Sequence, residues 1–194
     1  MKKENLTIFV VEDSEMALAA VTNELQKRIN CKVRGFTSAE DCIHRMEDSL
    51  PDLIISDYYL STAEHHRMNG DQLLARIKQK YTDIPVIMYS SKNSIDTVIH
   101  LMSLGAVDFI PKEKNFIARI SDTALNTVKK IVYDNEMKSF TRGVMLFFSF
   151  IIVTLVAVYS YVPDLLPYFT IGIPVTLLLG LFFLSNGNAE SRSS

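Results

Sequence analysis

The chain has 194 residues, 48% of them hydrophobic, and a formal net charge of -2. Positions 143–184 hold 30 hydrophobic residues out of 42, and this uneven distribution excludes a disordered chain, a coiled coil and a purely soluble single domain. Before Gly143 the 19 basic residues are balanced by 20 acidic ones, so we expect no nucleic-acid partner, because phosphate binding draws on a basic surplus.

Five short apolar runs, most of them rich in β-branched residues, recur in the first part of the chain and predict β-strands. They lie at residues 6–11, 31–36, 53–56, 85–89 and 107–110. Apolar side chains at helical spacing lie between or after these runs: Met16, Ala20, Leu25 and Ile29; Leu73, Leu74 and Ile77; Ile95, Val98, Ile99 and Met102; Ile117, Ile120, Ala124, Val128 and Ile131. Strands that alternate with helices and are apolar throughout are typical of a parallel sheet covered on both faces. The sequence therefore predicts a doubly wound α/β domain.

Polar side chains follow four of these runs, at the carboxyl ends where ligands bind in sheets of this kind. Glu12 and Asp13 follow the first run, Asp57 the third, Ser90 the fourth and Lys112 the fifth. Three carboxylates that meet at one place repel one another unless a divalent cation lies between them, and oxygen-only ligation suits Mg²⁺. A lysine and a hydroxyl beside them suit the oxygens of a phosphoryl group. The set predicts Asp57 as a nucleophile that forms an aspartyl-phosphate.

Five motifs resemble, in the same order, those of the receiver domain of two-component response regulators. They are Val-Val-Glu-Asp-Ser at 10–14, Pro-Asp-Leu-Ile-Ile-Ser-Asp at 51–57, Met-Asn-Gly at 68–70, Ile-Pro-Val-Ile-Met-Tyr-Ser-Ser at 84–91 and Gly-Ala-Val-Asp-Phe-Ile-Pro-Lys at 105–112. The resemblance covers residues 5–133. It implies a flavodoxin-like fold with five helices and a five-stranded parallel sheet of order 2-1-3-4-5.

The resemblance also implies a role for each residue of the pocket. Asp57 would accept the phosphoryl group, and Lys112 would contact the phosphate. Glu12 and Asp13 would hold Mg²⁺ together with Asp57 and the backbone carbonyl of Tyr59. Ser90 would be the switch hydroxyl, and Phe109 would change rotamer on activation. The implied phosphate donor is a histidine kinase or a phosphotransfer protein. The implied output surface is the face of the fourth helix, fifth strand and fifth helix, where a homodimer would also form.

The chain departs from the family pattern on both sides of the pocket. Ser61 and Glu113 stand where family members usually carry proline, and the loop from Ser61 to Met68 is longer than usual. That loop holds His65 and His66, which we interpret as solvated side chains rather than as metal ligands or phosphorelay residues. None of these changes removes a residue that the chemistry needs.

Two other classes of function stay open. An aspartyl-nucleophile phosphatase usually has a second Asp two residues after the nucleophile, whereas this chain has Tyr59 there. A binding scaffold would keep the acidic pocket without turning over a phosphate. Taken alone, the pair Glu12 and Asp13 would also be typical of a helix N-terminal cap. We expect a signalling domain rather than an enzyme, with no catalysis beyond the phosphorylation and dephosphorylation of its own Asp57.

The C-terminal part of the chain is predicted to form a membrane hairpin. Residues 143–162 carry no charge over 20 positions, which as a helix span about 30 Å and match a bilayer core. Pro163 and Asp164 indicate a turn before a second apolar stretch at 165–184. The alternative is a pair of core helices in a soluble oligomer, but the second stretch offers no polar face. The predicted domains are a receiver at 1–133, a helical linker at 134–142, two transmembrane helices at 143–184 and a polar tail at 185–194.

Basic residues just before the first predicted span set the expected orientation. Lys129, Lys130, Lys138 and Arg142 precede it, whereas the turn at Pro163 has no basic residue. The positive-inside rule then predicts a multi-pass protein of the inner membrane, in contact with lipid, with the receiver and both termini in the cytoplasm. We expect no DNA-binding or enzymatic output domain after the receiver.

The last helix of the receiver is predicted to run on into the first span. No proline lies between Pro111 and Pro163, and Gly143 is the only glycine in that stretch. A glycine inside a helix costs about 1 kcal/mol relative to alanine, which weakens the helix without ending it. We expect at most a bend near residues 139–143.

Overall fold

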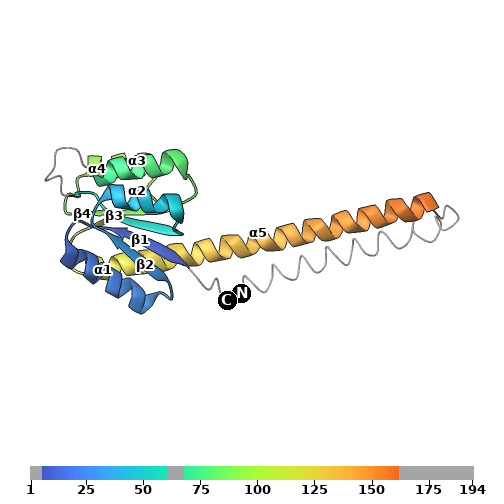
Figure 1. The fold of residues 1–194 in the computed structure, drawn as a ribbon, viewed down its shortest axis with the longest axis horizontal. Helices are drawn as coiled ribbons and strands as arrows, with labels where there is room; N and C mark the ends of the chain where they lie inside the picture. Colours follow the sequence, from blue (N-terminus) through green and yellow to red (C-terminus); the bar gives the residue numbers. More distant parts are fainter. Residues whose placement is uncertain (1–5, 61–67, 162–194) are drawn as a thin grey trace. The chain divides into compact units, whose positions relative to one another are not determined.

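The structure, a computed structural model, describes residues 6–60 and 68–161. The strands form one parallel sheet with helices on both faces (Figure 1). The elements in chain order are β1 (Thr7–Val11), α1 (Glu15–Arg28), β2 (Lys32–Phe36), α2 (Ala39–Asp48), β3 (Leu53–Asp57), α3 (Gly70–Lys80), β4 (Val86–Ser90), α4 (Ile95–Ser103), β5 (Asp108–Pro111) and α5 (Phe116–Tyr161). The chain divides into two compact units, Met1–Glu136 and Met137–Ser194, and the described strands all lie in the first.

The strand order is β2-β1-β3-β4-β5 and every pair is parallel, which confirms the order that the resemblance implied. Val11 of β1 pairs with Ser56 of β3, and Asp57 of β3 pairs with Tyr89 of β4. This register brings the carboxyl ends of the strands to one edge. The strand order reverses between β1 and β3, and the crevice at such a reversal is where open α/β sheets bind ligands.

The two faces of the sheet have separate hydrophobic cores. Helices α1 and α5 cover one face, where Leu25 and Ile120 are fully buried. Helices α2, α3 and α4 cover the other face, where Leu73 and Leu101 are fully buried (Figure 1). The sheet is therefore doubly wound, as the alternation of strands and helices predicted. Most predicted core positions of α3 and α5 are confirmed, since Leu74, Ile77, Ala124 and Val128 are also buried, whereas Ile117 and Ile131 are half-buried.

The second predicted strand forms, but it lies at the edge of the sheet and is not buried. In β2, Lys32, Arg34 and Gly35 are exposed, while Val33 and Phe36 are half-buried. The prediction that all five runs are covered on both faces was wrong here, because an edge strand has a neighbour on one side only. By contrast β3 and β4 are buried along their whole length.

The predicted core face of α1 was partly wrong. Met16 is 83% exposed, whereas Val21 and Leu25 are fully buried. At 3.6 residues per turn, Leu25 lies nine positions and half a turn away from Met16, so the two side chains are on opposite sides of the helix. Leu25 and Ile29, which the spacing also selected, do belong to the core.

The apolar stripe predicted on α4 faces away from the sheet. Ile95, Ile99 and Met102 are exposed, and Ile99 has 61% of its surface accessible. The buried residues of α4 are Thr97 and Leu101, which lie on the opposite side of the helix. The spacing therefore predicted the helix correctly and its core face wrongly, because α4 carries apolar side chains on both sides.

Helix α2 has no counterpart among the helices that spacing predicted, and only the resemblance implied it. Its buried residues are Ala39, Cys42 and Met46 on an otherwise charged segment. Ser38 caps it by accepting a hydrogen bond of 3.1 Å from the amide of Asp41. Three small or flexible apolar residues among charges give a weak periodic signal, which explains the omission.

Helix α5 continues across Gly143, so the prediction of a last helix without a turn is confirmed. Among the described residues it is the one helix long and apolar enough to cross a membrane, with a mean hydropathy of 2.1 in its apolar window, a criterion of length and composition alone. In the second unit its large apolar side chains, such as Phe147 and Val153, are exposed. The second predicted span, at 165–184, lies outside the described residues, so the hairpin stays a prediction.

Candidate functional site

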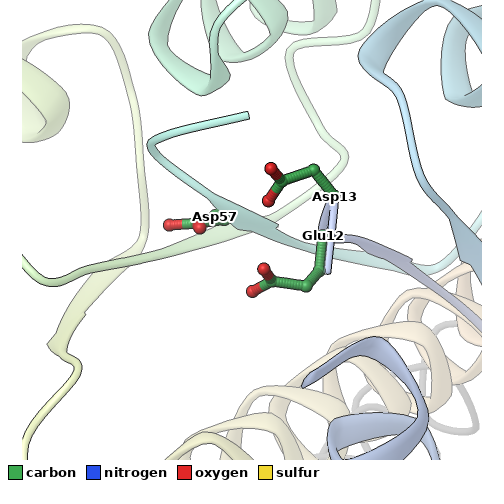
Figure 2. Close-up of side chains that lie close together, drawn as sticks. All are labelled: Glu12, Asp13 and Asp57. Carbon is green, nitrogen blue, oxygen red and sulfur yellow. The ribbon is translucent and has the colours of Figure 1, made fainter. Parts of the chain in front are cut away.

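Three carboxylates meet at the carboxyl edge of the sheet, beside the reversal of strand order (Figure 2). Glu12 and Asp13 directly follow β1, and Asp57 is the last residue of β3. One carboxylate oxygen from each lies within 4.8 Å of the others. The cap of α1 is Ser14, whose side chain accepts a hydrogen bond from the amide of Ala17, so the cap role considered for the acidic pair belongs to Ser14.

Lys112, which follows β5, joins two of these carboxylates. Its Nζ donates a hydrogen bond of 2.6 Å to Oδ2 of Asp57 and one of 3.0 Å to Oε2 of Glu12. Glu12 and Asp57 are almost fully buried, whereas Lys112 keeps 22% of its side chain accessible. The ammonium therefore compensates two buried negative charges and remains within reach of the opening of the pocket.

Burial and the contact between Asp57 and Lys112 act in opposite directions on the pKa of each residue. Burial raises the pKa of Asp57 to about 6, although the hydrogen bond and the charge of Lys112 act to lower it. For Lys112, burial acts to lower the pKa, but the hydrogen bonds and charges of Asp57 and Glu12 outweigh it, and the net direction is upward. Near neutral pH the lysine is a cation and Asp57 is mostly ionised, as a nucleophile requires.

Tyr89 is a member of the pocket that the sequence did not predict. Its hydroxyl donates a hydrogen bond of 2.9 Å to Oε2 of Glu12, and its ring is fully buried. The nearest signal in the sequence is the alternation of β4, which turns Ile87 and Tyr89 to the same face. The contact itself joins residues 77 positions apart, and strand alternation alone gives no such distance.

Ser90 is the last residue of β4 and Phe109 lies within β5, and among the described residues Ser90 makes no hydrogen bond to Asp57. Ser90 is fully buried, and its Oγ accepts a hydrogen bond of 3.1 Å from the amide of Lys92. Phe109 is half-buried and packs against the core beneath α2, α3 and α4. Among the described residues, the Asp57 carboxylate accepts hydrogen bonds from Nζ of Lys112 and, at 3.3 Å, from the backbone amide of Tyr59.

The backbone after Asp57 is fixed by the start of α3. The amide of Gly70 donates a hydrogen bond of 2.9 Å to the carbonyl of Tyr58. A Cβ atom at Gly70 would overlap the carbonyl oxygen of Asp57 and lie 2.8 Å from Cα of Tyr58, so this position accepts no side chain without moving the backbone. The glycine of the Met-Asn-Gly motif is therefore required for a steric reason. Residues 61–67 of the long predicted loop, with His65 and His66, lie outside the described residues.

The donor set fits a divalent cation with a preference for oxygen ligands. Glu12, Asp13 and Asp57 offer carboxylate oxygens only, and no described His or Cys belongs to the cluster. Hard oxygen donors of this kind suit Mg²⁺, whereas nitrogen and sulfur donors would favour zinc. The amide of Tyr59 donates a hydrogen bond to Oδ1 of Asp57, and the metal ligation by the Tyr59 carbonyl stays a prediction.

The fold and this pocket define a doubly wound α/β domain with an acidic pocket at the carboxyl ends of its strands. The family model described as "Response regulator receiver domain" matches residues 8–121, and the chain belongs to this family. Receiver domains are signalling domains of two-component systems, which bind Mg²⁺ at such an acidic pocket and take phosphoryl groups from histidine kinases or phosphotransfer proteins. The resemblance of the five motifs is thereby confirmed at the level of the family.

The matches to curated relatives cover only part of each relative. A protein-glutamate methylesterase/protein-glutamine glutaminase of Geobacter sulfurreducens is 34% identical over 108 residues, which cover 55% of this chain and 28% of that protein. A protein of the same description from Clostridium acetobutylicum is 28% identical over 141 residues, which cover 70% of this chain and 39% of that protein. The matches thus span less than half the length of either relative.

Solved structures agree with this assignment. The receiver domain of a LuxO repressor protein from Vibrio parahaemolyticus is 26% identical, with a TM-score of 0.59, and the match covers 68% of this chain and 95% of that one. NtrX from Brucella abortus is 25% identical with a TM-score of 0.60, and the match covers 69% of this chain and 30% of that one.

Proposed function

We propose that the chain is a membrane-tethered receiver that accepts a phosphoryl group on Asp57 from a histidine kinase or a phosphotransfer protein. The observation that carries this proposal is the hydrogen bond of 2.6 Å between Lys112 and the buried Asp57 carboxylate, with Glu12 and Asp13 beside it. An acidic pocket closed by a lysine is arranged for a negatively charged phosphoryl group and a cation, not for a neutral substrate.

The proposed transfer uses the residues as follows. An Oδ of Asp57 attacks the phosphorus of a phosphohistidine, a P–O bond forms, and the P–N bond breaks as the imidazole leaves. Mg²⁺, held by Glu12, Asp13, Asp57 and the Tyr59 carbonyl, would offset the charge on the phosphoryl oxygens. Lys112 is free to donate to the new phosphoryl group from the position where it now contacts Asp57.

The proposed signal leaves the pocket through Ser90. Its hydroxyl moves toward the phosphate, Phe109 turns inward, and the face of α4, β5 and α5 changes. That face offers the exposed Ile95, Ile99 and Met102 of α4 to a partner or to a second copy of the chain.

Phosphorylation by a small donor tests the chemistry. Acetyl phosphate with Mg²⁺ is expected to label one residue, and the label is expected to be absent in Asp57→Asn and in the presence of EDTA. Asp96→Asn is the matched control, because Asp96 is an exposed carboxylate in the first turn of α4. Label that persists in Asp57→Asn contradicts the proposal.

Two further measurements separate the receiver from its rivals. A receiver is expected to give a saturable response to beryllofluoride with Mg²⁺ that Asp57→Asn abolishes. An aspartyl-nucleophile phosphatase would instead release phosphate from a phosphomonoester over many turnovers, for which Tyr59 in place of a second Asp is poorly suited. A scaffold would bind Mg²⁺ without forming the beryllofluoride complex.

The membrane tether rests on the apolar part of α5 and on the composition of residues 143–184. The full-length protein is expected to pellet with membranes and to resist carbonate extraction, whereas a chain shortened to residues 1–135 is expected in the supernatant. The proposed location is the inner membrane with the receiver in the cytoplasm, where a kinase that uses ATP is found. Protease added outside intact spheroplasts should then leave the receiver uncut, and cleavage there would contradict this orientation.

A further inference from the structure

Tyr89 connects the metal pocket with helix α5 through three contacts of its side chain. The hydroxyl donates to Oε2 of Glu12 at 2.9 Å. The Nζ of Lys112 lies 5.0 Å from the centre of the Tyr89 ring, within the range of a cation–π interaction. The ring of Tyr89 also stacks on the ring of Phe116, the first residue of α5, with the two centroids 6.3 Å apart.

The Tyr89 hydroxyl is a fixed donor to a buried carboxylate. Glu12 is only 2% exposed, so its oxygens depend on protein donors or a cation for compensation. Oε2 of Glu12 accepts from both Tyr89 and Lys112, whereas Oε1 accepts from the amide of Ser14 at 3.3 Å. When Lys112 turns to a phosphoryl oxygen, Tyr89 remains as the side-chain donor to Oε2.

We propose that Tyr89 is a positioning residue for the divalent cation, which acts by holding the Glu12 carboxylate in its place in the pocket. This inference rests on the proposed Mg²⁺-dependent phosphoacceptor function. Hydrogen-bond partners behind a metal ligand fix its orientation, and their removal typically weakens metal binding by about 10 to 100-fold. The buried ring of Tyr89 fills the core, and its hydroxyl orients the carboxylate of Glu12.

The test removes the hydroxyl and keeps the ring. Tyr89→Phe retains the stack on Phe116 and the aromatic surface below Lys112, so the core stays filled. Tyr81→Phe is the matched control, because Tyr81 lies at the end of α3 and its ring contact is with Lys80. Mg²⁺ is titrated into each full-length protein in the same detergent, with amide NMR shifts as the readout. We expect the Mg²⁺ dissociation constant to rise about 10-fold in Tyr89→Phe and to stay unchanged in Tyr81→Phe.

A double-mutant cycle with Glu12→Gln shows whether Tyr89 acts through Glu12. If it does, Tyr89→Phe weakens Mg²⁺ binding in the unaltered chain but adds little in the Glu12→Gln background. An equal effect in both backgrounds, or an unchanged dissociation constant in Tyr89→Phe, overturns the inference while the proposed function stands. An unaltered chain that binds no Mg²⁺ overturns both.

A further measurement uses the unaltered chain, so its result does not depend on whether the variants fold. In the Mg²⁺-saturated protein, the hydroxyl proton of Tyr89 is expected to be protected from exchange with water and visible by NMR, because it stays bonded to Glu12. A Tyr89 hydroxyl that exchanges as fast as that of an exposed tyrosine after Mg²⁺ is added overturns the positioning role.

Discussion

The ammonium of Lys112 lies 2.6 Å from Oδ2 of Asp57, so before any phosphate arrives the lysine neutralises the residue that is proposed to accept it. The same ammonium reaches Glu12 at 3.0 Å. Without a bound cation, Lys112 therefore offsets the charges of Glu12 and Asp57 together. This balance makes the stability of the domain depend on pH, on Mg²⁺ and on the charge at position 112.

Removal of the charge of Lys112 should destabilise the domain when Mg²⁺ is absent. Lys112→Met keeps much of the side-chain volume but leaves Glu12 and Asp57 buried without their counter-ion. We expect the free energy of unfolding in EDTA to fall by about 3 kcal/mol, the lower end for breaking a buried pair, because Lys112 is partly accessible. Mg²⁺ should restore more stability to Lys112→Met than to the unaltered chain. Thermal unfolding checks this, with exposed Lys114→Met as the control.

The raised pKa of Asp57 makes a prediction with a definite sign. Burial raises it from 3.8 to about 6, so between these values the folded state binds more protons than the unfolded state. The contribution of Asp57 to stability therefore falls as pH rises from about 4 to about 6 and is constant above. In EDTA, Asp57→Asn should be more stable than the unaltered chain at pH 8, by up to roughly 3 kcal/mol, and equally stable at pH 4. Urea unfolding at the two pH values measures this difference, and a constant difference contradicts it.

The existence of the strands and the main pocket residues could be predicted from the sequence because both depend on local signals. Buried strands are apolar runs, and the residue after each run lies at a known edge of a parallel sheet. Glu12, Asp57 and Lys112 were located in this way, and the structure joins them. Which neighbour each strand pairs with is not a local property, so the strand order came from the resemblance.

The faces of the helices and the contacts of Tyr89 could not be predicted in the same way. Spacing of apolar residues identifies a helix, but α4 carries Ile99 on its exposed side and Leu101 on its buried side. The choice between the two sides depends on the sheet beneath. Likewise, Tyr89 is a typical strand residue, and its bond to Glu12 depends on the register of β3 between them.

The exposed side of α4 should serve association and not stability. Ile99→Asp places a charge on an exposed position, and we expect a change of no more than about 0.5 kcal/mol in the free energy of unfolding. Leu101→Asp, only two residues away, places a charge in the core and should unfold the domain. If α4, β5 and α5 form the proposed dimer surface, beryllofluoride should promote dimers of the unaltered chain but not of Ile99→Asp, as measured by sedimentation. If Ile99→Asp dimerises as well as the unaltered chain, the dimer interface does not include this side of α4.

A methyl group at Gly70 should displace the backbone of Asp57. The added Cβ would overlap the carbonyl oxygen of Asp57, and because the atoms it meets are backbone, no side chain can turn away to make room. We expect Gly70→Ala to lower the free energy of unfolding by about 2 kcal/mol, within the range for overpacking, and to weaken Mg²⁺ binding as Asp57 shifts. Gly143→Ala is the matched control, since its Cβ meets nothing within 4 Å and alanine favours the helix by about 1 kcal/mol. Thermal unfolding and Mg²⁺ titration of the two variants measure both effects. If Gly70→Ala unfolds and binds Mg²⁺ like Gly143→Ala, the close approach of α3 to Asp57 does not constrain the pocket.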